Sequence, residues 1–124
     1  MRLRQYTLIA LPLFFLHILE EHYFNFIQTD ASIGWLSDLF NISRSNAYWT
    51  VQVLLAVFLL LLILARPMRK IWYVVLGIIF IVELSHIWKA LVSRSYDPGF
   101  WTAIPLVILG ALFWRELLRD KIHE

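Results

Sequence analysis

Ionisable side chains stand inside two segments of the chain that are otherwise apolar. Near the N-terminus, His17, Glu20 and Glu21 lie within HILEEHYFNF, and much later ELSH supplies Glu83 and His86. Residues three or four positions apart share one face of an α-helix. His17 therefore shares a face with both of its glutamates, and Glu83 shares one with His86. Imidazoles with carboxylates at these spacings are ligand types that zinc, iron and manganese sites use, which favours a divalent metal site.

Two metal arrangements are compatible with these residues. In a mononuclear arrangement, His17, Glu21 and His86 bind zinc, and Glu20 acts as the general base on a bound water. In a dinuclear arrangement, the two segments bracket two metal ions, as in di-iron four-helix bundles. The dinuclear set is less complete, because the other apolar segments supply no interior carboxylate. Zinc is therefore favoured over iron or manganese, and hydrolysis is favoured over di-metal oxidase-type chemistry.

The same residues also suit functions without catalysis. An ionised side chain at the centre of a membrane helix costs about 2.5 to 3.5 kcal/mol, so such residues are generally functional. They could serve a channel or carrier for protons or cations. They could also hydrogen-bond helices together in a structural membrane subunit. The sequence leaves these alternatives open.

The segments that carry these residues are those of a membrane protein. The chain has 124 residues, of which 60% are hydrophobic and only 16% charged, whereas soluble domains have about 25% charged residues. Four apolar segments each approach the length of about 20 residues that spans a bilayer as a helix. We expect an all-α, four-helix transmembrane bundle that forms one integral membrane domain over residues 1–124. Its transmembrane helices are predicted at about 6–27, 46–65, 70–92 and 100–118.

Basic residues are distributed unevenly between the two sides of this bundle. Eight of them fall on one side: Arg2, Arg4, Arg66, Arg69, Lys70, Arg115, Arg119 and Lys121. By the positive-inside rule, this side and both chain termini face the cytoplasm. On the opposite side, apolar residues recur at helical spacing between Ile33 and Phe40, which is compatible with either a short interfacial helix or a plain amphipathic linker in the first connection.

Further polar residues are expected near the outer half of the bundle, at the level of the two His/Glu clusters. Pro98 and Gly99 favour a chain reversal between the last two predicted helices. The supporting residues are Asn46, Gln52, Tyr96, Pro98, Gly99 and Thr102. We expect membrane lipids as partners and a lipid or small apolar molecule as substrate. The sequence has no phosphate-binding loop or nucleic-acid motif, so nucleotides and nucleic acids are disfavoured.

The spacing of His17, Glu20 and Glu21 resembles the signature of the HXXEE family of small, mostly bacterial integral membrane proteins. The segments ELSH and YDPGFWTAIPL are similar to the second histidine-bearing helix and the Tyr-x-Pro-Gly turn of that family. The resemblance implies a metal-dependent enzyme in the bacterial cytoplasmic (inner) membrane. The resemblance indicates candidate residues for the site, but it does not indicate a substrate.

The charge distribution predicts the orientation of the termini. Single cysteines introduced at Arg2 and at Lys121 should react with a membrane-impermeant maleimide only after the cytoplasmic side is exposed, because the chain itself has no cysteine. Labelling of either position in intact cells or outward-facing vesicles would contradict the charge argument.

Overall fold

The computed structural model describes residues 2–65 and 69–119, and every regular element in these ranges is a helix. The order is α1 (Leu3–Tyr23), α2 (Phe26–Thr29), α3 (Ala31–Phe40), α4 (Arg44–Leu64), α5 (Lys70–Val82), α6 (Leu84–Ser93) and α7 (Phe100–Arg119). The all-α prediction is therefore confirmed for this part of the chain. Arg66 and Lys121, which entered the charge argument, lie outside the described residues.

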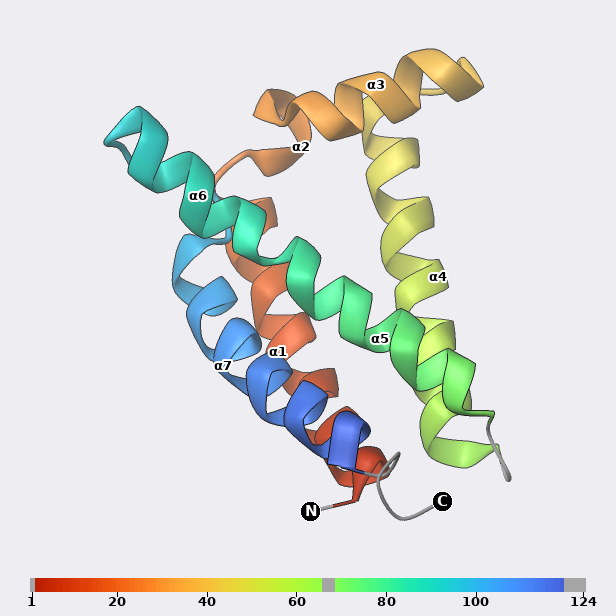
Figure 1. Ribbon diagram of the computed structural model, residues 1–124. Helices are drawn as coiled ribbons and strands as arrows, with labels where there is room; N and C mark the ends of the chain where they lie inside the picture. Colours follow the sequence, from red (N-terminus) through yellow and green to blue (C-terminus); the bar gives the residue numbers. More distant parts are fainter. Residues whose placement is uncertain (1, 66–68, 120–124) are drawn as a thin grey trace.

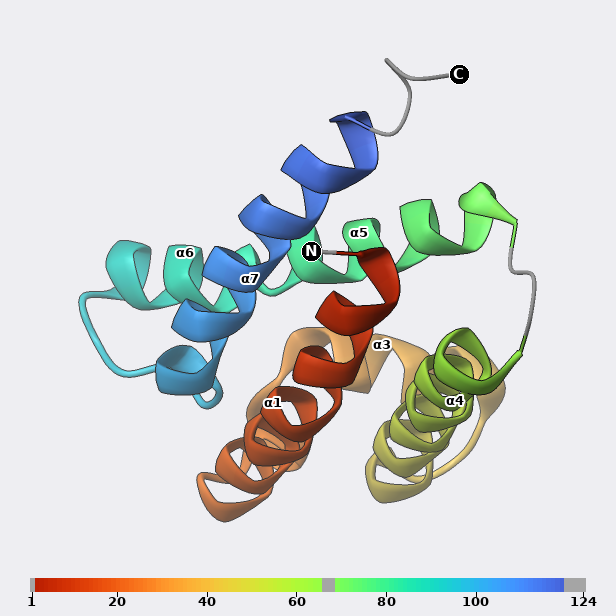
Figure 2. The ribbon, with the colours of Figure 1, turned by 90° about the horizontal axis from the view of Figure 1, so that it is seen from below.

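The long helices form a bundle with α1 and α7 side by side at its centre (Figures 1 and 2). Helix α7 packs against α1 on one side and against α5 and α6 on the other, while α4 packs against α1. The short helices α2 and α3 cross the end of the bundle opposite the start of α1 and the end of α7 (Figure 1). The helix ends that carry Arg4, Lys70, Arg115 and Arg119 thus lie at the other end of the bundle from α3.

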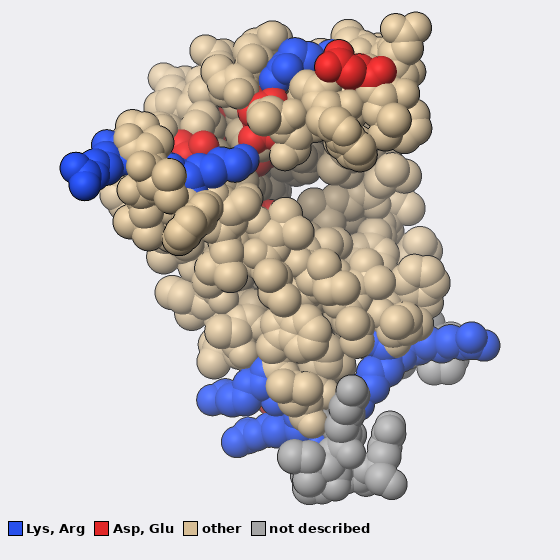
Figure 3. Space-filling view, turned by 45° about the horizontal axis from the view of Figure 1, so that its top comes forward, with Lys and Arg blue, Asp and Glu red and all other residues tan. Residues whose placement is uncertain are grey.

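Three helical segments of the described chain, and not the expected four, are long and apolar enough to cross a membrane. They are Arg44–Leu64, Lys70–Ser93 and Phe100–Arg119. Helix α1 has 21 residues, which is long enough, but its sequence includes Arg4, His17 and two glutamates that lower its mean hydropathy. In the view of Figure 3, charged side chains gather towards the two ends and an uncharged band lies between them.

Two of the expected helices are interrupted close to the candidate chemistry. The first was predicted over 6–27, but α1 ends at Tyr23 and Asn25 adopts a left-handed backbone conformation with φ of 62°. The segment predicted as one helix over 70–92 is broken at Glu83, which ends α5 and precedes α6. A local break in helical hydrogen bonding frees backbone groups and redirects the chain. Here the break lies three positions before His86, within Lys70–Ser93, which is still long and apolar enough to cross a membrane.

The larger of two hydrophobic clusters fills the half of the bundle that contains the start of α1 and the end of α7, and the smaller one lies where α2, α3 and α4 meet. The larger cluster includes Phe14 of α1, Leu59 of α4, Phe80 of α5 and Phe113 of α7. The rings of Phe14 and Phe80 are stacked with centroids 5.8 Å apart. Because His17 and Glu83 each follow one of these rings by three positions, the aromatic pair packs directly next to the polar cluster.

The short helix considered for the first connection is present as α3, and a buried carboxylate holds it to the bundle. Asp30 caps α3 by accepting hydrogen bonds from the backbone N–H groups of Ser32 and Ile33. Its second oxygen accepts a hydrogen bond of 2.8 Å from Nζ of Lys89 on α6. Since Asp30 is only 7% exposed, this ion pair is a fixed link between α3 and α6.

Close packing of α5 on α7 predicts the effect of enlarging Gly110. A Cβ at this position would lie 2.6 Å from the Cβ of Phe80. The substitution Gly110→Ala should therefore destabilise the protein by about 1 to 3 kcal/mol through overpacking, in spite of the higher helix propensity of alanine. Thermal unfolding in detergent should show a lower midpoint. Ala111→Val, at the exposed neighbouring position, is the control, and an equal midpoint for both variants would contradict the packing argument.

Candidate metal centre

Two separate parts of the chain bring their ionisable side chains to one buried group. His17 and Glu21 lie one helical turn apart on α1, while Glu83 stands at the break between α5 and α6 and His86 lies in the first turn of α6. All four are less than 9% exposed. The helices that carry them pack more extensively against α7 than against each other. The His/Glu side chains, together with the stacked rings of Phe14 and Phe80, connect α1 with α5 and α6.

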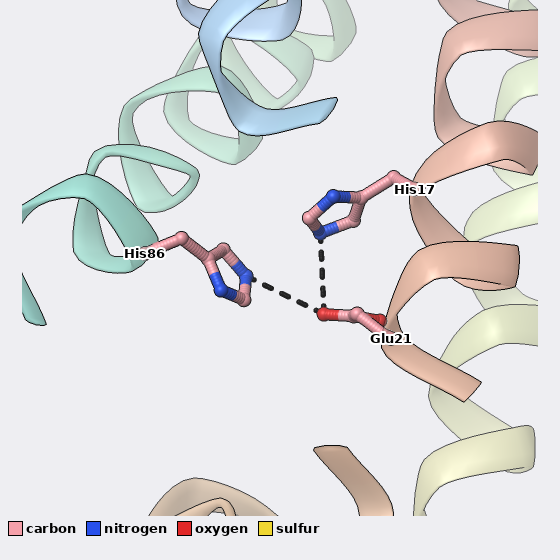
Figure 4. A group of neighbouring side chains, drawn as sticks. All are labelled: His17, Glu21 and His86. Atoms are coloured by element: carbon pink, nitrogen blue, oxygen red, sulfur yellow. Dashed lines mark ion pairs between the residues drawn. The ribbon is translucent and has the colours of Figure 1, made fainter. Parts of the chain in front are cut away.

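The four polar atoms that face one another lie at similar separations. Nε2 of His17 is 3.2 Å from Oε1 of Glu21 and 3.0 Å from Oε2 of Glu83. Nε2 of His86 is 3.4 Å from Oε1 of Glu21 and 3.8 Å from Oε2 of Glu83. Figure 4 shows the imidazole rings of His17 and His86 both directed at the same oxygen of Glu21, one from α1 and one from α6.

Nδ1 of each imidazole has a hydrogen-bond partner outside the group. That partner determines whether Nε2, which faces the group, carries a proton or a lone pair. Nδ1 of His86 is 2.8 Å from a carboxylate oxygen of Asp97, and a carboxylate can only accept, so this nitrogen carries a proton. Nδ1 of His17 is 2.7 Å from Oγ1 of Thr102, whose hydroxyl donates to the carbonyl oxygen of Gly99. In neutral imidazoles, both Nε2 atoms therefore direct a lone pair at the two glutamates.

Four inward-facing lone pairs repel one another unless protons or a cation lie between them. Atoms bound to zinc at about 2.0 to 2.2 Å in tetrahedral geometry lie about 3.3 to 3.6 Å apart, close to the separations among these four atoms. His17, Glu21 and His86 form the group of described residues that could hold a metal ion. Oε2 of Glu83 is buried without a hydrogen bond of normal geometry, although Nε2 of His17 is near. This combination could hold a divalent cation, and a protonated imidazole between the carboxylates would satisfy the same contacts.

Glu20, which was expected to act with Glu21, has a different environment. Its carboxylate accepts hydrogen bonds from the backbone N–H groups at the start of α7, those of Gly99 at 2.8 Å, Trp101 at 3.2 Å and Thr102 at 2.8 Å. The hydroxyl of Tyr96 donates to the same carboxylate. Partial burial and this carboxylate raise the pKa of Tyr96, so the hydroxyl stays protonated. An anion at a helix N-terminus satisfies free N–H groups and the helix dipole, so Glu20 fixes α7 to α1.

Gly99 allows this turn to approach the two histidines. Its φ is 96°, a left-handed conformation that side chains with a Cβ rarely adopt. A Cβ here would also lie 2.7 Å from Cε1 of His17 and 2.9 Å from Cε1 of His86. The glycine is thus needed both for the bend before α7 and for the close contact with the cluster.

The other expected supporting residues divide into two groups. Thr102 contacts His17 and Tyr96 contacts Glu20, so the structure brings both to the site. Gln52 is half-buried on α4 and lines a cavity that His17 and Glu21 also line. Asn46 is exposed in the first turn of α4, and Pro98 lies in the turn before α7. In the described part of the chain, neither makes a hydrogen bond with the His/Glu group.

Two further residues of the site, Tyr48 and Asp97, were not predicted from the sequence. Tyr48 is fully buried, and its hydroxyl donates a 2.7 Å hydrogen bond to Oε2 of Glu21. Asp97 orients His86, as described above. A partner of this kind is typical of metal-binding histidines. Asp97 could have been identified from the sequence, because its carboxylate stands directly before the expected Pro98–Gly99 turn. Tyr48 could not, because in the sequence it resembles an ordinary aromatic residue of the membrane interface.

The role of Gly99 can be tested by adding a single methyl group. Gly99→Ala should destabilise the protein by about 1 to 3 kcal/mol, because it combines backbone strain with a clash against both histidines. Thermal unfolding in detergent measures the loss. Pro98→Ala, one position earlier in the same turn, should cost less. A Gly99→Ala protein as stable as the Pro98→Ala protein would show that the turn can move away from the histidines.

Comparison with known proteins connects this arrangement with a family. A family model described as "Protein of unknown function with HXXEE motif" matches residues 8–114. The motif corresponds to His17, Glu20 and Glu21, which the structure distributes between the buried His/Glu group and the start of α7. Searches of curated proteins and of solved structures gave no significant match. Because the family model covers most of the chain, the protein belongs to the family of proteins of unknown function with the HXXEE motif.

Proposed function

We propose that this protein is a metal-dependent membrane hydrolase that acts on a lipid or a small apolar substrate. The observation that carries the proposal is the convergence of two imidazole nitrogens and two carboxylate oxygens at separations of 3.0 to 3.8 Å. Both imidazoles are also oriented from outside, by Thr102 and Asp97. Such outer partners fix the tautomer of a histidine that binds metal.

Each residue of the group has a proposed role. His17, Glu21 and His86 hold the metal, a two-histidine, one-carboxylate set that leaves a position for water in catalytic zinc sites. Zinc is favoured, with iron or manganese as alternatives. The metal would lower the pKa of bound water and polarise a carbonyl group. Glu83 takes over the role of general base that was expected for Glu20, because its buried Oε2 faces the two imidazoles without a hydrogen bond, while the oxygens of Glu20 accept hydrogen bonds from the start of α7.

The proposal also includes the placement of the protein in the membrane. We propose that α1 crosses the bilayer together with the three candidate spans, with both termini in the cytoplasm of a bacterium. Two arguments support a fourth span. Helix α1 has 21 residues and runs beside α7 for most of its length (Figure 1), and its His17 and Glu21 side chains face the bundle interior, where membrane proteins keep ionisable groups.

The adjacent glutamates provide a matched pair of variants for testing the metal site. Glu21→Gln should reduce the content of bound metal strongly, because it removes a charged ligand, whereas Glu20→Gln should keep the metal and lower only stability. Elemental analysis of the purified proteins measures both. His17→Ala and His86→Ala should also lose metal, and Glu83→Gln should keep metal while losing turnover of ester or amide lipids.

Other results would favour the alternative functions. If all these variants bind metal as the wild type does, the group is not a metal site. A channel or carrier would show pH-dependent flux of protons or cations through liposomes, altered by Glu21→Gln, without formation of any product. A structural subunit would show neither flux nor product, and its variants would change only stability or assembly.

A further inference from the structure

A cavity of about 390 Å³ leads away from the His/Glu group between α1, α4 and α5. Its polar end is formed by His17, Glu21 and Glu83, with Gln52 beside them. The rest of the lining is apolar: Phe14, Val51, Leu54, Leu55, Phe58, Val75, Ile79 and Val82. A cavity with one chemically active end and one apolar body matches the shape of an amphiphile.

The rim of this cavity is apolar and lies within two candidate membrane spans. Leu54 of α4 is 64% exposed and Val82 of α5 is 59% exposed, and both line the cavity. In Figure 3, a hollow in the surface is visible near the uncharged band, with acidic atoms at its edge. The cavity therefore opens towards the hydrocarbon of the bilayer, from which an apolar chain can enter without crossing water.

A second apolar cavity, of about 350 Å³, lies against α1 and α4 but has no ionisable lining residue. Phe14, Gln52 and Leu55 line both cavities, so the two cavities adjoin at these residues. One chain entering between α4 and α5 reaches the His/Glu group, while a chain in the second cavity does not. This difference favours a ligand with a single chain.

We propose that the cavity binds a single-chain amphiphile, with its alkyl or acyl chain between α4 and α5 and an uncharged ester or amide at the His/Glu group. This inference rests on the proposed function for the chemistry at the polar end. An anionic head is disfavoured because the described residues that line the cavity include two glutamates and no lysine or arginine. Hydrolysis would add water across the ester or amide, releasing a fatty acid and an alcohol or amine.

Chain binding can be measured apart from catalysis with a photoactivatable monoacylglycerol that carries a diazirine in its acyl chain. After illumination in lipid nanodiscs, mass spectrometry should locate the label on the cavity-facing residues of α4 and α5. Leu55→Trp should lower this labelling several-fold by filling the cavity. Leu61→Trp is the matched control, because Leu61 is 51% exposed on the same helix and does not line the cavity.

A second variant guards against misfolding of the first, and the content of bound metal separates the chain-site proposal from the hydrolase proposal. Val75→Trp fills the cavity from α5 and replaces Leu55→Trp if that protein fails to fold by circular dichroism and size-exclusion chromatography. Equal labelling of cavity and control variants, or label spread over the exposed faces, would overturn the inference. Labelling is compared with and without added zinc. Cavity labelling in a protein that binds no metal would refute the proposed hydrolase and support the chain site, whereas bound metal without cavity labelling would refute only the chain site.

Discussion

The fold depends on keeping two imidazoles and two carboxylates together inside an apolar bundle. Removing such groups from water costs several kcal/mol per ion unless each has partners. Here the partners come from three other places in the chain: Tyr48 donates to Glu21, Asp97 accepts from His86, and Thr102 faces His17. The cluster is thus tied to α4, to the turn before α7 and to α7 itself, so the positions of these elements are coupled through one polar group.

The adjacent glutamates of the motif explain how this group is held in place. Consecutive residues on a helix point about 100° apart, so Glu20 and Glu21 face different neighbours. Glu21 enters the buried group, and Glu20 binds the backbone N–H groups at the start of α7. That second contact brings Gly99 and Thr102 against the histidines. One glutamate contributes to the candidate metal centre, while the other positions the helix that completes it.

The sequence was sufficient for what depends on local pattern and insufficient for what depends on packing. Apolar length predicted the long helices, and helical spacing predicted that His17 shares a helix face with Glu21 and that Glu83 shares one with His86. The breaks at Asn25 and Glu83 were missed because neither residue carries a strong breaking signal such as proline. Helical spacing alone could not assign different roles to Glu20 and Glu21. The position of α7 determines which of the two glutamates faces the N-terminus of α7. Tyr48 was missed because only packing places its hydroxyl beside Glu21.

The surroundings of the cluster bear on the choice between the proposed chemistry on a lipid-soluble molecule and a passage of ions through the bundle. A conduit needs polar groups or water on both sides of the site. Between the cluster and the end of the bundle where α1 begins, the stacked rings of Phe14 and Phe80 adjoin an apolar core. Among the described residues of that half, Thr7 is the buried polar one, and its hydroxyl donates to the carbonyl of Leu3. Transport would therefore require this core to separate, whereas a substrate from the bilayer would reach the cluster through the existing cavity.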